Sequence, residues 1–251
     1  KRTTIGKVCQ DDPTMMYPNP SYLKYYPDEQ LPQLSDIHRS SCLRVGTYLV
    51  IDKIVHHYHL QGYLKDMIGD KYGLFLDLCA YTIIMENNAA QYYPDYAYNH
   101  PLFTEDMKIY SDSAVSKFLH AITKDESIHF LNAWNAHRDH RSKIYISYDS
   151  TNKKCQAGDI ELVETGRSKL GQSDTIFNMS IAYDRTNREP LFYEDYPGSI
   201  TDIVQLTAMI EKAKAFGYKH AGFVLDRGYF SEPNIRFMDE NGYEFVIMVK
   251  G

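Results

Sequence analysis

Hydrophobic residues recur every three to four positions over much of residues 41–142, which is the spacing of amphipathic helices. One helix is predicted over 112–122. Another is predicted to begin at Thr123, because the Thr123 hydroxyl and the Glu126 carboxylate have the spacing of a capping box. Residues 1–40 are instead rich in proline and tyrosine and predict an extended arm with little regular structure. The first part of the chain is therefore expected to be an arm followed by a helical domain.

From residue 143 to residue 251 the pattern changes to short apolar or alternating runs separated by turn-forming residues. Two helical stretches in this part each end at a glycine, Gly217 and Gly242, which is a common C-terminal cap. We expect the order β-β-β-α-β-α-β, an antiparallel meander followed by two parallel crossovers, with helices covering a mixed sheet. The predicted strands are 144–149, 175–183, 190–193, 221–225 and 243–249, and the predicted helices are 200–216 and 231–241.

The stretch 151–174 is too long for an ordinary connection in a compact domain, since most loops are shorter than about 12–15 residues. It contains several glycines and a group of basic residues. We therefore expect a functional basic segment here, and its cations are candidates for contact with an anionic partner. These cations are Lys153, Lys154, Arg167 and Lys169.

The composition is that of a folded protein, with 43% hydrophobic and 24% charged residues. The formal net charge is −6, and both halves of the chain carry an excess of acidic residues. The chain therefore lacks the general basic character that is typical of nucleic-acid-binding proteins. A function on DNA would require cations placed locally around an acidic site.

The four cysteines are widely scattered, without the spacing of a zinc site or of a disulfide framework, which favours a reducing, cytoplasmic setting. The longest apolar stretch, 73–85, is interrupted by Asp77 and is too short to span a bilayer. No signal peptide is evident after Lys1. The sequence thus predicts no association with a membrane.

Two aspartates, Asp149 and Asp226, stand at the ends of the first and fourth predicted strands. In a sheet of the expected order those two strands lie side by side, so the carboxylates should meet at one edge of the sheet. Two close carboxylates repel each other unless a cation neutralises them, and such oxygen ligands favour Mg²⁺ or Mn²⁺. Two such ions can promote phosphoryl transfer. Gly228 leaves space near Asp226 for the approach of a phosphodiester backbone.

Each aspartate alone has a simpler explanation, because acids at strand ends commonly cap turns or helices. A phosphatase of the haloacid dehalogenase class also places an aspartate at a strand end. That chemistry needs a second acid two residues later, where this chain has Thr151. The acids alone therefore do not decide the function.

Four short motifs stand in a definite order and spacing along residues 143–251. They are Tyr148-Asp149-Ser150-Thr151-Asn152, Gly166-Arg167-Ser168-Lys169, Tyr196-Pro197-Gly198-Ser199-Ile200-Thr201-Asp202 and Leu225-Asp226-Arg227-Gly228-Tyr229-Phe230-Ser231. Their order and spacing resemble the DDE transposases of bacterial insertion sequences. This group has an RNase H-like, or integrase-like, catalytic core with a long insertion before its last acid. The resemblance covers residues 143–251 and is weaker over the helical region.

The resemblance implies an α+β or α/β fold in which an N-terminal helical region, 41–142, precedes the first part of an RNase H-like mixed sheet with flanking helices. The helical region would serve DNA binding or dimerisation. Asp149 and Asp226 would be the first two metal-binding acids, holding two Mg²⁺ or Mn²⁺ ions without any small-molecule cofactor. Arg227 is a further candidate for contact with DNA.

By the same resemblance, the third acid is a glutamate on a later helix. Glu240 and Glu244 follow Asp226 too closely to be that residue. We therefore expect that the third acid has no counterpart here and that this chain alone does not catalyse strand transfer.

The resemblance implies nicking at the ends of a transposon, followed by attack of the freed 3′-hydroxyl on target DNA. The partners would be double-stranded DNA and a second copy of the chain, acting at the bacterial nucleoid. An alternative is a non-catalytic DNA-binding or oligomerising remnant of a truncated transposase gene.

Two features of the helical region also have more than one interpretation. His56 and His59 could face the same side of one helix and bind a metal, although packed or solvated histidines are commoner. The helices within 112–139 could form a helix-turn-helix unit or a plain packing unit.

Overall fold

The computed structural model describes residues 2–9, 12–19, 21–29, 42–155, 160–167 and 173–249. The chain forms two compact units. One consists of residues 1–55 and 73–117, and the other of residues 56–72 and 118–251. The boundaries at 40 and 142 that the sequence suggests remain predictions.

The N-terminal residues contain a short hairpin rather than only an extended arm. Strand β1 (Gly6–Val8) pairs antiparallel with β2 (Met16–Pro18), and a 3-10 turn, η1 (Tyr22–Lys24), follows. Asp12 closes the hairpin loop by accepting hydrogen bonds from the backbone N–H and the hydroxyl of Thr14. The expectation of little regular structure was therefore wrong for this part, while residues 30–40 lie outside the described part of the chain.

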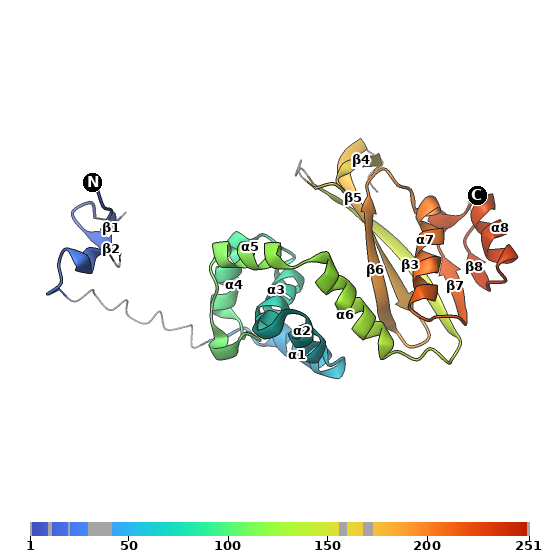
Figure 1. The fold of residues 1–251 in the computed structure, drawn as a ribbon, viewed down its shortest axis with the longest axis horizontal. Helices are drawn as coiled ribbons and strands as arrows, with labels where there is room; N and C mark the ends of the chain where they lie inside the picture. The colour runs from blue at the N-terminus through green and yellow to red at the C-terminus, as the bar shows by residue number, and fades with distance from the viewer. Residues whose placement is uncertain are drawn as a thin grey trace. The chain divides into compact units, whose positions relative to one another are not determined.

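Helices dominate the chain up to residue 136, as the hydrophobic spacing predicts (Figure 1). The predicted helix over 112–122 is confirmed as α5. Short 3-10 turns, η2 (Gly69–Lys71), η3 (Ala90–Tyr92) and η4 (Glu105–Met107), lie between them. The helices are α1 (Gly46–His57), α2 (Leu60–Ile68), α3 (Tyr72–Met85), α4 (Tyr93–Asn99), α5 (Asp112–Ala121) and α6 (Lys124–Ala136).

A buried carboxylate organises the first compact unit. Asp77, in the middle of α3, is only 1% exposed. It accepts hydrogen bonds from the backbone N–H of Phe103 at 2.6 Å, and from the N–H and hydroxyl of Thr104 at 3.1 and 2.5 Å. Asp77, which interrupts the longest apolar stretch of the sequence, thus links α3 to the loop at Phe103 and Thr104.

The histidine pair on α1 and α2 does not share a helical face. His59 adopts the left-handed conformation, with φ 55°, and separates the two helices. His56 and His59 therefore belong to different segments, and the premise of a one-turn spacing was wrong. Across the described ranges, no cluster of three or more His, Cys, Asp and Glu side chains is arranged to hold a metal ion.

Helix α6 begins with the predicted capping box and packs against the edge of the sheet. The Thr123 hydroxyl accepts from the Glu126 N–H at 3.3 Å, and the Glu126 carboxylate accepts from the Thr123 N–H at 2.6 Å. Further along the helix, the buried Trp134 donates its ring N–H to the carbonyl of Pro190 at 2.8 Å. The capping box therefore begins α6, and Trp134 near the other end of α6 holds the helix against Pro190 of the sheet.

The sheet combines antiparallel and parallel pairing in the order predicted (Figure 1). Strand β3 pairs antiparallel with β5, and β5 pairs antiparallel with β4 and β6 on its other side. On its free side β3 pairs in parallel with β7, and β7 with β8. A meander extended by two parallel strands beside its first strand is the RNase H-like arrangement. The strands are β3 (Ile144–Lys154), β4 (Glu164–Arg167), β5 (Ser173–Asp184), β6 (Glu189–Pro197), β7 (Ala221–Leu225) and β8 (Phe245–Ile247).

The stretch 151–174 is not one long loop. Strand β3 continues to Lys154, β5 already begins at Ser173, and β4 lies between them. The prediction of one long connection was wrong for residues 151–154 and 164–167, and Asp149 lies within β3 instead of at its end. Polar residues continue β3 because their backbone groups pair with β5 up to Ile176.

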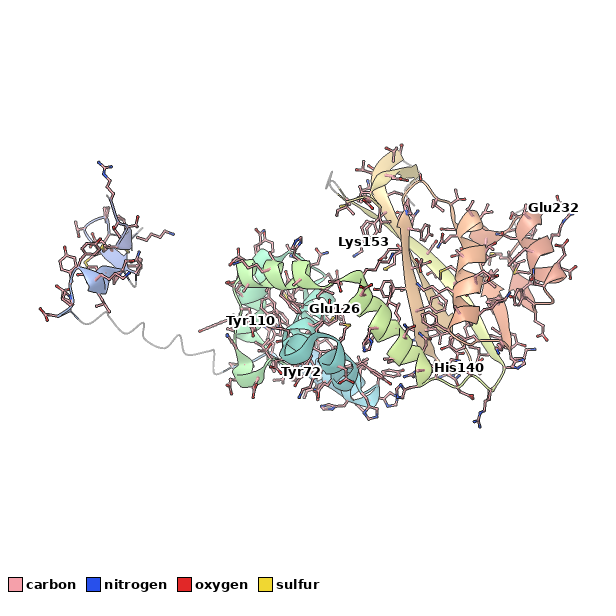
Figure 2. The ribbon with its side chains drawn as sticks, viewed as in Figure 1. Tyr72, Tyr110, Glu126, His140, Lys153 and Glu232 are labelled. Carbon is pink, nitrogen blue, oxygen red and sulfur yellow. The ribbon has the colours of Figure 1, made fainter. Side chains whose placement is uncertain are left out.

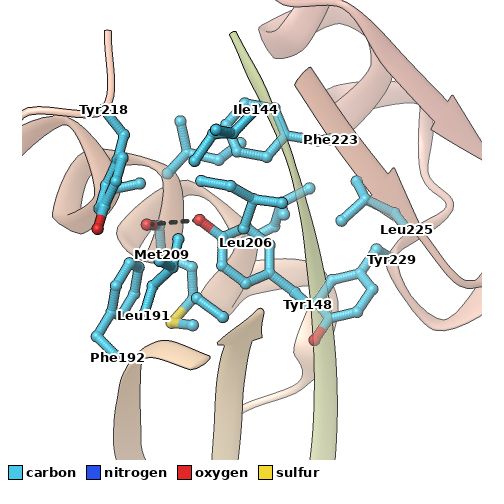
Figure 3. Packing of buried hydrophobic residues seen from close by; sticks show 14 of the residues in the cluster. Ile144, Tyr148, Leu191, Phe192, Leu206, Met209, Tyr218, Phe223, Leu225 and Tyr229 are labelled. Carbon is cyan, nitrogen blue, oxygen red and sulfur yellow. Dashed lines mark hydrogen bonds between the residues drawn. The ribbon is translucent and has the colours of Figure 1, made fainter. Parts of the chain in front are cut away.

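One hydrophobic core joins the sheet to helices α7 (Asp202–Ala215) and α8 (Glu232–Glu240). Tyr148 of β3 lies at its centre and is 2% exposed. The Tyr148 hydroxyl donates to the main-chain oxygen of Met209 at 3.0 Å, which ties β3 to α7 (Figure 3). Phe223 and Leu225 of β7 pack in the same core. The strand that leads to Asp149 is therefore fixed against a helix on its buried face.

Candidate active site

The parallel pairing of β3 and β7 places Asp149 and Asp226 at equivalent points of neighbouring strands. Tyr148 is paired with Leu225 in the register of the two strands, and each aspartate is the next residue along its chain. Both aspartates are exposed, whereas Tyr148 and Leu225 are buried. The two aspartates thus stand at neighbouring positions of adjacent strands, and both are exposed to solvent.

Asp226 shapes the turn that carries it. Its Oδ1 atom accepts the backbone N–H of Gly228 at 2.8 Å and so caps the 3-10 turn η5 (Arg227–Tyr229). A Cβ on Gly228 would lie 2.8 Å from that same oxygen, closer than real Cβ atoms approach. Glycine at 228 therefore leaves room for the Asp226 carboxylate, and the approach of a phosphodiester there stays a prediction.

A third aspartate, Asp202, lies beside this turn at the first residue of α7. Its Oδ2 atom is 3.6 Å from the point that a Cβ on Gly228 would occupy. The same oxygen accepts a hydrogen bond from the Ser150 hydroxyl at 2.6 Å, and Oδ1 accepts one from Tyr196 at 2.7 Å. Sequence reasoning quoted Asp202 only as part of a motif. The available signal was its position after Thr201 at a helix start, which also describes an ordinary first-turn acid.

The buried phenol of Tyr229 feels the charge of all three carboxylates. Burial raises the pKa of Tyr229 well above its usual value, and the negative charges of Asp202, Asp226 and Asp149 raise it further, while a hydrogen bond with Ser150 lowers it. The pKa of Tyr196 is likewise raised, first by burial and then by its hydrogen bond to Asp202. Both phenols are therefore neutral at physiological pH, so no charge from the tyrosines is added to this acidic edge.

A pocket of about 420 Å³ opens next to Asp202 and Gly228. Asn178 shapes its wall, because its side-chain amide donates to the carbonyls of Pro197 and Ile200 at 3.0 and 2.9 Å and holds the loop before α7. Hydroxyl and amide side chains form most of the polar lining. The polar side chains of the lining are those of Ser150, Thr151, Asn152, Asn178, Ser199, Thr201 and Asp202.

The candidate cations differ in how far they are already engaged. Lys154 forms an ion pair with Asp174 at 2.6 Å. Lys153, near the end of β3 (Figure 2), and Arg227 are exposed, and neither has a carboxylate partner among the residues that the structure describes. The side chain of Arg167 is not described, and Lys169 lies outside the described residues.

Of the two later glutamates, Glu244 lies away from the acid pair. Glu244 forms an ion pair with Lys143, just before the first residue of β3. Because β3 and β7 run in parallel, this ion pair lies at the opposite end of the strands from Asp149 and Asp226. Glu240 is the last residue of α8.

The donor set suits a hard divalent cation. Asp149 and Asp226 offer carboxylate oxygens, which are preferred by Mg²⁺ and Mn²⁺, and the neighbouring side chains add hydroxyls and amides rather than thiols or imidazoles. One oxygen of Asp226 is engaged by Gly228, which fixes the side chain while its second oxygen stays available. The residues present therefore fit such an ion at two carboxylates.

Comparison with known proteins finds a likeness over the sheet-forming part of the chain. Residues 147–251 match the family model of the transposase DDE domain. That span begins on β3 just before Asp149 and includes Asp226. This part of the chain is therefore similar to the transposase DDE domain.

Two solved structures show a distant likeness. They are a Mos1 transposase paired-end complex with the left transposon end and a pre-cleavage Mos1 transpososome, each 12% identical with a TM-score of 0.27. The matches cover 67% and 68% of this chain, but the chain spans only 56% and 58% of those transposases. No curated protein matches the chain significantly. Among the helices described, none is both long and apolar enough to cross a bilayer.

Proposed function

We propose that this chain supplies the first two metal-binding acids of a DNA transposase, Asp149 and Asp226. The observation that carries the proposal is the register of β3 and β7, which puts the two exposed aspartates at adjacent strand positions within the span that is similar to the transposase DDE domain. Divalent ions held there, two in number, would supply the charge stabilisation for displacement at phosphorus.

The residues of the chain have separate roles in this proposal. Asp149 and Asp226 bind the cations, and the Gly228 N–H keeps the Asp226 carboxylate in one orientation. Lys153 and Arg227 are exposed cations near the acids and attract the phosphates of double-stranded DNA. Lys154, Arg167 and Lys169 are weaker candidates, the first because of its ion pair with Asp174.

The reaction proposed is hydrolytic nicking at the ends of an insertion sequence, followed by strand transfer to target DNA. It needs no covalent protein nucleophile and no small-molecule cofactor. Since Glu240 and Glu244 follow Asp226 too closely in the sequence to be the third acid that the resemblance implies, we expect the 251-residue chain by itself to be inactive in strand transfer. Action as a homodimer, at the bacterial nucleoid in the cytoplasm, completes the proposal.

Metal titration of the chain tests the acid pair. We expect Mn²⁺ to bind to the parent chain and binding to weaken by at least about tenfold in Asp149→Asn and in Asp226→Asn, since each removes a carboxylate ligand. Asp239→Asn, which neutralises an exposed acid on α8, is the matched control and should bind as the parent does. Equal Mn²⁺ affinity in the parent and both site variants would show that the site is assigned wrongly.

DNA binding without Mn²⁺ binding would instead support a non-catalytic remnant. This alternative can be read from the same protein samples, because a remnant keeps its contacts with DNA phosphates but has no need of the acid pair. Binding to a DNA duplex in the absence and presence of Mn²⁺ separates the two functions.

A further inference from the structure

Asp202 joins three elements at the acidic edge. It is the first residue of α7, and it accepts hydrogen bonds from Ser150 on β3 and from Tyr196 near the end of β6. Both carboxylate oxygens are engaged by hydroxyl donors, at 2.6 and 2.7 Å. Ser150 and Tyr196 are 8% and 3% exposed, so these charge-assisted bonds are largely shielded from water.

These contacts are more than an ordinary helix start requires. An acid in the first turn is favoured by the helix dipole alone, and it can remain exposed to solvent. Asp202 instead points its oxygens at side chains from two strands of the sheet. Thr201, which precedes it, makes no side-chain capping bond, so the beginning of α7 is anchored through Asp202.

The hydrogen bond to Ser150 bears directly on Asp149. The two residues are neighbours on β3, and their side chains point to opposite faces of the sheet. Ser150 is buried and held by Asp202 on one face, while Asp149 projects into solvent on the other. Fixing the Ser150 side chain therefore fixes the peptide unit from which the Asp149 carboxylate extends.

Asp202 also borders the turn that carries Asp226. The position that a Cβ on Gly228 would occupy is 3.6 Å from Asp202 Oδ2 and 2.8 Å from Asp226 Oδ1. The same carboxylate that holds Ser150 thus lies against the second acid's turn. The Asp202 side chain therefore contacts both the strand that carries Asp149 and the turn that carries Asp226.

We propose that Asp202 is a positioning residue that sets the separation of Asp149 and Asp226 by accepting the hydroxyl hydrogen bonds of Ser150 and Tyr196. The inference rests on the proposed function of the acid pair. In this proposal Asp202 acts through the hydrogen bonds that both of its oxygens accept, and it is not one of the two metal-binding acids.

The test compares Ser150→Ala, Tyr196→Phe and Asp202→Asn with the parent chain by Mn²⁺ titration. Removal of a residue that orients a metal ligand weakens metal binding by about tenfold, and we expect a loss of that order in Ser150→Ala and Asp202→Asn. The double variant Ser150→Ala/Asp202→Asn should lose less than the sum of the two single losses, because both substitutions act on the same hydrogen-bonded pair. Glu211→Gln, which removes one negative charge from an exposed position on α7, is the control and should not change the affinity.

A second measurement detects the positioning itself. Amide hydrogen exchange at residues 149–151 should speed up by roughly tenfold in Ser150→Ala and Asp202→Asn, because the strand is no longer held from α7. Exchange in Glu211→Gln should match that of the parent.

The outcomes separate the two proposals. If the parent binds Mn²⁺ and Ser150→Ala binds it equally well while Asp202→Asn does not, Asp202 acts by charge alone and the positioning role is wrong. If the parent does not bind Mn²⁺, the acid-pair assignment fails, and hydrogen exchange alone decides about Asp202. Unchanged exchange at 149–151 in both variants overturns the positioning role in either case.

Discussion

The backbone N–H of Gly228 donates to Oδ1 of Asp226 at 2.8 Å, so the carboxylate assigned to metal binding also closes the turn on which it stands. A side chain at residue 228 would collide with that oxygen. The orientation of the Asp226 carboxylate therefore depends on the absence of a side chain two residues later.

Substitution Gly228→Ala should displace the Asp226 carboxylate and weaken Mn²⁺ binding by about tenfold, since a new Cβ has no space beside Oδ1. Isothermal titration with Mn²⁺ measures the effect, and circular dichroism checks that the chain is folded. Gly62→Ala on α2 is the control, because a Cβ there meets nothing within 4 Å. Parent-like affinity in Gly228→Ala would show that the turn tolerates the change and does not orient the ligand.

The exposed cations should differ in their contribution to DNA binding. Lys153→Gln is expected to lower the affinity for duplex DNA and to reduce the slope of log K against log salt by about 0.9, the value for one phosphate contact. Lys154→Gln should have a smaller effect, because Lys154 is already paired with Asp174.

Fluorescence anisotropy over a series of salt concentrations measures both slopes. Lys219→Gln serves as the control, since Lys219 is exposed and precedes β7 at the end of the strand away from Asp226. Equal slopes for all three variants would place the DNA elsewhere on the molecule.

Tyr148→Phe should destabilise the second compact unit by about 1 kcal/mol, which is typical for loss of one buried hydrogen bond. The phenol is buried and its hydroxyl donates to the Met209 carbonyl. Urea unfolding followed by circular dichroism gives the free-energy difference. Tyr145→Phe is the matched control, because Tyr145 is 40% exposed and its hydroxyl makes only a 3.3 Å contact with Glu244. A larger loss in the control than in Tyr148→Phe would contradict this account of the core.

Asp77→Ala should destabilise the first compact unit by about 3 kcal/mol, since the backbone N–H groups of Phe103 and Thr104 would be left buried without an acceptor. Asp77→Asn keeps one acceptor oxygen and should cost less. Thermal unfolding of both variants beside Asp95→Asn, an exposed acid on α4, measures the difference. Near-parent stability of Asp77→Ala would mean that the loop is held in another way.

The ion pair between Lys143 and Glu244 should make stability depend on pH. The hydrogen bond and positive charge of Lys143 hold the pKa of Glu244 below its usual value of 4.5. Its contribution is therefore present above pH 4.5 and is lost as the pH falls through the lower folded value. For Lys143, whose pKa is raised above 10.5 by Glu244, the contribution is present below pH 10.5 and is lost as the pH rises through the folded value.

Glu244→Gln should consequently be less stable than the parent at neutral pH and equal to it in strong acid. Urea midpoints at about pH 7 and about pH 2 give the comparison, and high salt should reduce the difference at neutral pH because the pair is exposed. A difference that persists unchanged in acid would have a cause other than the ion pair.

The order of elements after residue 143 could be predicted because each strand and helix carries its own hydrophobic period. The capping box at Thr123 and Glu126 was equally clear, since it depends only on residues three apart. The pairing of the strands that carry Asp149 and Asp226 followed from topology rules, and the observed register agrees with it.

Features that depend on tertiary partners could not be predicted in the same way. The extension of β3 through Thr151 to Lys154 has a polar sequence, and only its pairing with β5 makes it a strand. The role of Asp202 depends on Ser150, 52 positions away in sequence, and no local period indicates such a contact. The left-handed conformation of His59 likewise breaks a helical pattern without any glycine or proline to signal it.

The acid pair depends on two strands that are distant in the sequence, with the β5–β6 hairpin and α7 between them. A ribosome must therefore complete β7 before Asp226 can pair with Asp149, and an unfinished or misfolded chain holds the two acids apart. The two acids therefore become neighbours only in a chain whose sheet has reached its native topology.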